Sequence, residues 1–253
     1  MLLIKLLLVP FLVLLITLAG RRWGPSVAGW VAGFPVVTAP TLLFISLDQG
    51  ATFAAAAAHA SLTGVLSNAS FIVAYAWMAL RAPWYGAAAV GVGTFAVVGW
   101  ALTTLHADPG LALITTVLGL MAASRSFPTV ALVKAARPPS PWELPIRCVA
   151  ASAMSLAVMQ MADRLGPTAS GLLAVFPVLG LLFGVFSQRV WGGAGAARLL
   201  AGMIRGLYAF TTFCFVLAVT LGALDTTWAF AAALMAALLV QIFTFKWLTI
   251  ATR

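Results

Sequence analysis

Apolar residues run along this chain in stretches of about twenty, which is the length a helix needs to cross the hydrocarbon core of a bilayer. Short polar or basic connections separate these stretches. We therefore expect an all-α polytopic membrane protein with about nine transmembrane helices. The fifth helix either stops at Ser124 or runs on to Val133, with Arg125 inside it. The predicted helices are 2–20, 25–47, 51–80, 84–105, 110–124, 146–163, 167–188, 195–221 and 226–248.

One sequence motif occurs twice. Segment 24–36 returns as 166–178, with Gly-Pro, Gly and Phe-Pro-Val at matching places, 142 residues later (166 minus 24). We expect two four-helix repeats, 1–105 and 146–253, joined by a linking helix and a cytoplasmic loop in 106–145, all within one membrane domain. Because a single helix separates the repeats, the second enters from the opposite face and the two are inverted. Further identical pairs are Ala32/Ala174, Phe44/Phe186, Gly50/Gly192, Ala54/Ala196, Ala55/Ala197 and Gly64/Gly206.

Composition and charge narrow the function classes. The chain is 63% hydrophobic and 8% charged, which leaves too little polar surface for a soluble domain. Its net charge of +9 comes from single cations at helix ends, a pattern typical of cytoplasmic loops and not of a nucleic-acid partner. We place the N-terminus outside and the C-terminus in the cytoplasm. The cytoplasmic cations are Arg21, Arg22, Arg81, Arg125, Lys134, Arg137, Arg147, Arg189, Arg198, Lys246 and Arg253, and the outer side carries Asp48, Asp108, Asp163, Asp225, Lys5 and Arg164.

A proline lies near the middle of the second helix of each repeat. Pro35 and Pro177 each remove a backbone hydrogen bond at a depth where a free carbonyl is costly, so we expect broken helices whose free groups contact a ligand. Pro40 and Gly180 would extend the two breaks. Phe34 and Phe176 join the candidate substrate-binding residues. The competing interpretation is an ordinary proline kink packed against a neighbouring helix.

Polar residues deep in the predicted helices complete the candidate site. Arg205 lies too deep to reach water easily, and we find no carboxylate at its depth, so we expect it to hold an anionic substrate. It could instead bind backbone carbonyls or lipid phosphate. His59 is available to carry a coupling proton. Thr38, Thr41 and Asn68 would form a polar wall.

We therefore expect a secondary transporter or flippase that moves a small anionic solute or lipid head group. The chain has two histidines, two cysteines and five acidic residues, which predicts no enzyme, metal site or cofactor. It contains no nucleotide-binding Gly-x-x-x-x-Gly-Lys-Ser/Thr motif, so a gradient or a partner must supply the energy. A non-transporting accessory subunit and a narrow channel are the alternative functions. The sequence also leaves open whether the chain forms a homodimer.

The repeated Ala/Ser-Gly and Phe-Pro-Val stretches, 28–36 and 170–178, resemble small bacterial inner-membrane proteins of the GlpM type, which carry such a stretch once. This chain looks like a fused double version. The resemblance covers about twenty residues in each half and implies a bacterial cytoplasmic membrane. It implies no activity or substrate.

Overall fold

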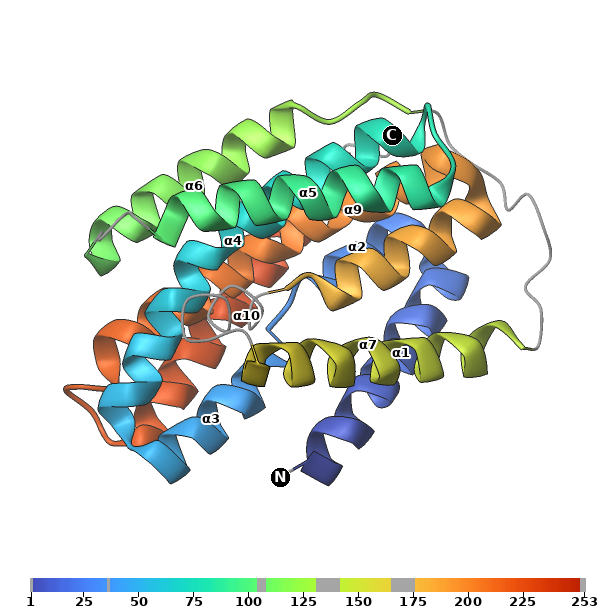
Figure 1. Ribbon diagram of the computed structural model, residues 1–253. Helices are drawn as coiled ribbons and strands as arrows, with labels where there is room; N and C mark the ends of the chain where they lie inside the picture. Colours follow the sequence, from blue (N-terminus) through green and yellow to red (C-terminus); the bar gives the residue numbers. More distant parts are fainter. Residues whose placement is uncertain (1, 36, 104–107, 131–141, 165–175, 251–253) are drawn as a thin grey trace.

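The fold is a bundle of α-helices (Figure 1). The computed structural model describes residues 2–35, 37–103, 108–130, 142–164 and 176–250, and every regular element in these ranges is an α-helix. The all-α class predicted from the sequence is thereby confirmed. The helices are α1 (Leu2–Trp23), α2 (Pro25–Ala32), α3 (Thr38–Gln49), α4 (Ala51–Ala79), α5 (Trp84–Thr103), α6 (Pro109–Arg125), α7 (Glu143–Arg164), α9 (Val178–Thr220) and α10 (Thr226–Ile250).

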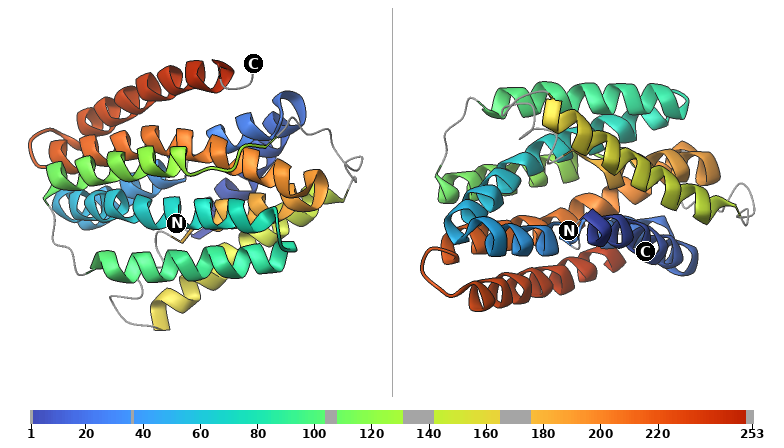
Figure 2. Two further views of the ribbon diagram at one scale, coloured as in Figure 1. Left: turned by 90° about the horizontal axis from the view of Figure 1, so that it is seen from above. Right: turned by 60° about the horizontal axis from the view of Figure 1, so that its bottom comes forward.

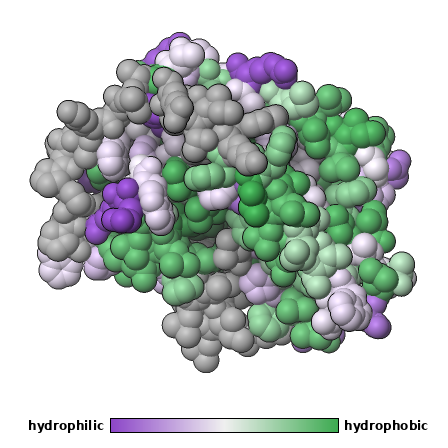
Figure 3. Space-filling model, turned by 180° about the vertical axis from the view of Figure 1, so that it is seen from behind, coloured by the Kyte–Doolittle hydropathy of each residue, from purple (hydrophilic) through white to green (hydrophobic). Residues whose placement is uncertain are grey.

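Four of the helices described are long and apolar enough to cross a membrane, over Ala51–Ala79, Trp84–Leu102, Val178–Thr220 and Thr226–Phe245. Nine such spans were predicted. Large apolar side chains, including Trp100 on α5 and Leu239 on α10, are exposed, as expected of surfaces that face lipid. Among the coloured residues of the face shown in Figure 3, apolar ones form a broad continuous area.

One helix boundary decides between two predicted ends, and another differs from the prediction. α6 ends at Arg125 and is capped by Ser126, so Pro128 lies outside the helix. α9 continues from 178 to 220, where two helices separated by 189–194 were predicted. Only Gly192 has non-helical backbone angles within it, at φ 72° and ψ −177°. One glycine in this conformation is enough to kink the chain, and the helix resumes at the next residue.

The middle of the molecule is an antiparallel pair formed by α4 and the longer part of α9, residues 193–220. Ala58 and Leu62, early in α4, share a buried cluster with Phe213, late in α9. Phe71, late in α4, shares another with Leu200, early in that part of α9. We name these the Phe213 cluster and the Phe71 cluster. α5 packs on α4 and α10 packs on α9, on opposite sides of the central pair (Figure 2).

Glycines allow α2 to cross α9 with the two backbones in contact. A Cβ atom placed on Gly33 would lie 2.6 Å from the Met203 carbonyl oxygen and 2.7 Å from the Cα of Gly206. A Cβ on Gly206 would collide with the carbonyl oxygen of Trp30. Gly29 and Gly202 are equally crowded, against Leu199 and Ser26 respectively. Gly29 and Gly33, four residues apart on α2 and its cap, thus allow the two helices to approach closely.

Candidate functional site

The first Phe-Pro sequence interrupts a helix. α2 ends at Ala32 and α3 begins at Thr38. The N–H of Phe34 donates to the carbonyl of Val31 (3.1 Å), where a continuous helix would direct it to Trp30, and Pro35 has no N–H to donate. The carbonyl of Trp30 therefore loses its helical partner.

A side chain from α10 replaces that partner. Nε2 of Gln241 donates to the Trp30 carbonyl oxygen at 3.0 Å. Nearby, the Thr244 hydroxyl accepts a bond from the Trp30 indole N–H (3.1 Å) and donates to the Gln241 carbonyl (3.0 Å). The rings of Trp30 and Phe245 are 5.0 Å apart. The break after α2 is thus bound to α10.

The second Phe-Pro sequence lies at the start of a helix. The N–H of Val178 donates to the Phe176 carbonyl at 2.8 Å, with Pro177 at φ −77° and ψ 57°, which is an inverse γ-turn. α9 then begins at Val178. The Phe176 ring meets Phe95 of α5 edge to face at 5.6 Å. The predicted helix over 167–188 lies partly outside the described residues, so the comparison with the first break starts at Phe176.

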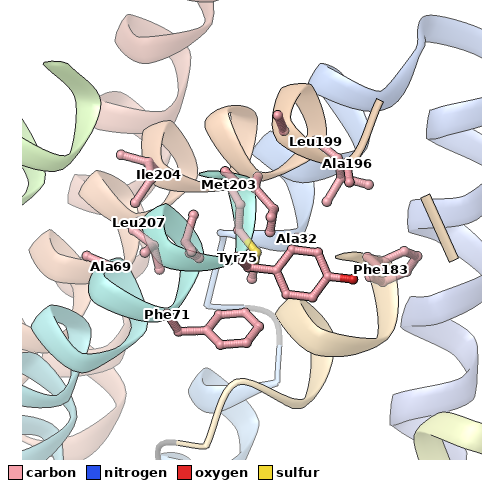
Figure 4. Close-up of a cluster of buried hydrophobic side chains, with 14 of the residues drawn as sticks. Ala32, Ala69, Phe71, Tyr75, Phe183, Ala196, Leu199, Met203, Ile204 and Leu207 are labelled. Atoms are coloured by element: carbon pink, nitrogen blue, oxygen red, sulfur yellow. The ribbon is translucent and has the colours of Figure 1, made fainter. Parts of the chain in front are cut away.

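The helix that follows each break packs against α4. We call α3 the first arm and residues 178–191 of α9 the second arm. Leu42 of the first arm lies in the Phe213 cluster. In the second arm, Cβ atoms on Gly180 and Gly184 would lie 3.1 Å from Phe71 and 3.2 Å from Tyr75. Figure 4 shows Phe71, Tyr75 and Met203 close together between α4 and α9.

Polar contacts hold the tips of both arms, with unequal numbers of bonds. In the second arm, Nε2 of Gln188 donates to the carbonyls of Ala79 (3.2 Å) and Ala82 (2.9 Å). Oε1 of Gln188 accepts the hydroxyl of Tyr75 at 3.0 Å. The corresponding residue of the first arm is Ser46 (188 minus 142), whose hydroxyl contacts that of Thr226 at 3.3 Å. Among the described residues, this is the single side-chain hydrogen bond of Ser46.

The predicted polar wall is dispersed. Thr38 begins α3 and is half-buried, and the hydroxyl of Thr41 donates to the Val37 carbonyl at 2.8 Å, within its own helix. Asn68 is half-buried on α4. His59 lies two turns earlier on α4, and its Nε2 is buried and has no hydrogen-bond partner in the part of the chain that the structure describes. Phe34 packs against the Phe213 cluster and Phe176 against the Phe71 cluster, so the two do not share one site.

Arg205 is half-buried on α9 and makes no hydrogen bond or ion pair with the part of the chain that the structure describes. Arg198 lies two turns earlier on the same side of the helix, since residues seven apart share a face. No hydrogen bond joins Arg205 to His59. We predicted that these two residues belong to one site, whereas the structure shows no direct contact between them.

Two residues predicted to break helices do not. Pro40 is the third residue of α3, where its missing N–H has no helical partner and costs nothing. Gly180 is the third residue of α9, and the helix continues through it. Of the four residues predicted to break helices, Pro35 lies between α2 and α3, and Pro177 immediately precedes α9. Gly180 instead provides space for the rings of the Phe71 cluster.

Arg147 differs most from its prediction. We expected a cytoplasmic flank, but the side chain is only 7% exposed. Its guanidinium lies 5.0 Å from the centre of the Phe186 ring and 5.9 Å from that of Phe183, and it donates to the Thr17 hydroxyl at 3.3 Å. Two aromatic faces and a hydroxyl can offset part of the cost of burying the charge. A signal existed, because Arg147 aligns with the cation Lys5 (147 minus 142).

Gln188 and Gln241 were also missed. Polar residues inside apolar helices are costly and tend to have a role, so both could have been identified by type. Neither glutamine belongs to a sequence motif or a regular series of polar residues that would have identified it. No group of three or more potential metal ligands occurs among the residues described. Comparisons with protein-family models, curated proteins and solved structures give no match, so the site is defined by its own geometry.

Proposed function

We propose that this chain is a secondary transporter or lipid flippase that works by alternating access between two inverted repeats. The observation that carries this proposal is the antiparallel pairing of the two equivalent long helices, α4 and residues 193–220 of α9, each preceded by an arm. A movement that separates one arm from its partner helix opens one side. The equivalent movement of the other arm opens the opposite side.

The packing of the central pair supports inversion. α4 and residues 193–220 of α9 are equivalent in the repeat and run antiparallel. A two-fold axis relating antiparallel helices is perpendicular to them. If both cross the bilayer, that axis lies in the membrane plane, which is the arrangement of inverted-repeat transporters. The distribution of cations supports a cytoplasmic C-terminus.

A small anionic solute or an anionic lipid head group is the proposed cargo. Arg205 is half-buried in a helix long enough to span the bilayer, and no described residue neutralises it. A guanidinium in this setting is suited to a carboxylate or phosphate. His59, whose buried Nε2 has no hydrogen-bond partner among the described residues, is an imidazole available for proton coupling.

A thermal-unfolding screen in detergent tests the proposal. The panel contains small carboxylates, inorganic phosphate and short-chain phospholipids. A compound that binds raises the melting temperature of the wild type, because it stabilises the folded state. Arg205→Ala should abolish that shift. Arg198→Ala is the matched control, being a half-buried arginine on the same face of α9, and it should retain the shift.

Flux into proteoliposomes then distinguishes transport from binding. We expect the compound that stabilises the wild type to cross the membrane, or the lipid to exchange between leaflets, only when the protein is present. If Arg205→Ala and Arg198→Ala behave alike and neither solute nor lipid moves, the transporter proposal is wrong. The accessory-subunit alternative would then be favoured.

A further inference from the structure

We propose that the C-terminal end of α2, together with Gln241, binds a small monovalent cation such as Na⁺. Gln241 is 6% exposed, so it is more than nine-tenths buried. Its amide nitrogen is held by the Trp30 carbonyl at 3.0 Å. Its amide oxygen, Oε1, is buried and has no hydrogen-bond partner among the residues that the structure describes.

Capping the end of α2 does not account for this oxygen. The Trp30 carbonyl needs a donor, and the amide nitrogen provides one. An acceptor buried beside it adds a desolvation cost that a donor-only side chain would avoid. Because the two amide atoms share one rigid plane, fixing Nε2 at the last turn of α2 holds Oε1 beside that turn. The acceptor is therefore kept in place at the helix break.

The local charge favours a positive ligand. The carbonyls at the C-terminal end of a helix carry a partial negative charge, and α2 stops here because the chain breaks at Pro35. Its last residue is Ala32, followed by Gly33. Carbonyl oxygens at the end of a broken helix coordinate coupling ions in transporters of inverted-repeat design. Gln241 adds one more neutral oxygen.

The type of oxygen selects the type of cation. Neither α2 nor the stretch 226–245 of α10 contains an aspartate or a glutamate. Neutral oxygens without a carboxylate suit a singly charged hard ion better than Mg²⁺ or Ca²⁺, whose protein sites use carboxylates. They are poor ligands for transition metals, which prefer imidazole or thiolate. An alkali cation is therefore the ligand class.

A second set of contacts fixes Gln241 and Trp30, the residues proposed to surround the cation. Thr244 lies one turn beyond Gln241, is 4% exposed, and links the Trp30 indole to the Gln241 carbonyl through its hydroxyl. Such outer contacts orient the groups that bind an ion. They also join α2 to α10, so an ion bound here would stabilise the contact between the first repeat and the last helix.

The use of this ion, although not its binding, rests on the proposed function. A cation that enters with an anionic solute offsets its charge, and the gradient of the cation supplies the energy. Arg205 is the sequence neighbour of Gly206, whose backbone lies against the Trp30 carbonyl, so the cation site and Arg205 are close to the same crossing of α2 and α9. The two sites are distinguished by their ligands, a cation at Gln241 and an anion at Arg205.

The test measures thermal unfolding of the full chain in detergent with NaCl, KCl or N-methylglucamine chloride at constant ionic strength. We expect the wild-type melting temperature to rise saturably with Na⁺ or K⁺ relative to N-methylglucamine. Gln241→Leu should weaken the apparent affinity about tenfold or more, because one ligand is lost. Gln188→Leu removes the other hydrogen-bonded glutamine and should keep the response, although the protein is less stable.

Direct binding of radioactive Na⁺ gives a second readout. If Gln241→Leu does not fold, Gln241→Glu replaces the amide by a carboxylate; it loses the donor to the Trp30 carbonyl and offers only oxygen ligands, so its stability should depend more strongly on Na⁺ than that of the wild type. The proposal is overturned if the wild type responds equally to all three salts, or if neither Gln241 variant changes the response. Na⁺ binding without solute flux would contradict only the proposed function, and flux indifferent to Na⁺ would contradict only this inference.

Discussion

Gly50 and Gly192, 142 residues apart, have nearly the same backbone conformation, with φ 90° and ψ 165° at Gly50 and φ 72° and ψ −177° at Gly192. Each joins an arm to the long helix that follows it. This region of backbone space is essentially restricted to glycine. The duplication read from the sequence therefore extends to the local geometry of the chain.

Replacing either glycine by alanine should destabilise the protein by about 1–3 kcal/mol, the usual cost of forcing a side chain into this conformation. A Cβ at Gly50 or Gly192 would meet no atom within 4 Å, so the loss comes from the backbone alone. Unfolding in detergent measures it. Gly222→Ala is the control, because it has equal space and no positive φ, and it should be near neutral. Equal stability of all three variants would contradict the interpretation.

The crossing of α2 and α9 predicts a steric effect instead. Gly206→Ala places a methyl group against the Trp30 carbonyl, and overpacking of this kind costs about 1–3 kcal/mol. Gly93→Ala, in the open part of α5, should have no such cost and gain slightly in helix propensity. Thermal unfolding of both variants separates the two effects. A loss of similar size in Gly93→Ala would show that the contact with Trp30 is not the cause.

The unequal bonding of the two arms predicts unequal mobility. Gln188→Leu removes three hydrogen bonds from the tip of the second arm, while Ser46→Ala removes one from the first. With about 0.6 kcal/mol for each bond within a membrane, the first change should cost roughly 2 kcal/mol and the second less than half of that. Amide hydrogen exchange should accelerate over 178–191 in Gln188→Leu, with 38–49 less affected. Uniform acceleration of both arms would argue against separate opening.

The contribution of the Tyr75 hydroxyl to the free energy of unfolding should depend on its hydrogen bond to Gln188. Tyr75→Phe is expected to cost about 0.5–1.5 kcal/mol in the wild type and close to nothing in Gln188→Leu, because the partner is then already absent. A double-mutant cycle of unfolding free energies measures this coupling. Additive losses would mean that the hydrogen bond contributes nothing to stability.

Arg147 provides a test of burial. Arg147→Lys keeps the charge but loses the planar contact with Phe183 and Phe186, and it should cost about 1–2 kcal/mol. Arg189→Lys, on an exposed part of α9, should be within about 0.5 kcal/mol of the wild type. Unfolding in detergent compares the two. An unchanged Arg147→Lys would indicate that the aromatic rings do not stabilise the guanidinium.

Local features of the fold could be predicted because their causes are local. Runs of apolar residues give the helices, and α10 was placed within two residues at its C-terminal end, 248 against Ile250. The missing N–H of Pro35 removes one helical hydrogen bond at a place that the sequence alone identifies. Pro40 was misplaced as a break because its effect depends on position in the helix, and an N-terminal turn tolerates proline.

The sequence by itself determined the apolar helices, the repeat and the positions of Pro35 and Pro177, since each depends on residues that are neighbours in the chain. Only the tertiary structure decided which polar side chains are buried. Arg147, Gln188 and Gln241 obtain their partners from helices far away in sequence. Which face of a helix meets which neighbour is set by the packing of the whole bundle, and an apolar helix in a membrane carries little pattern to reveal it.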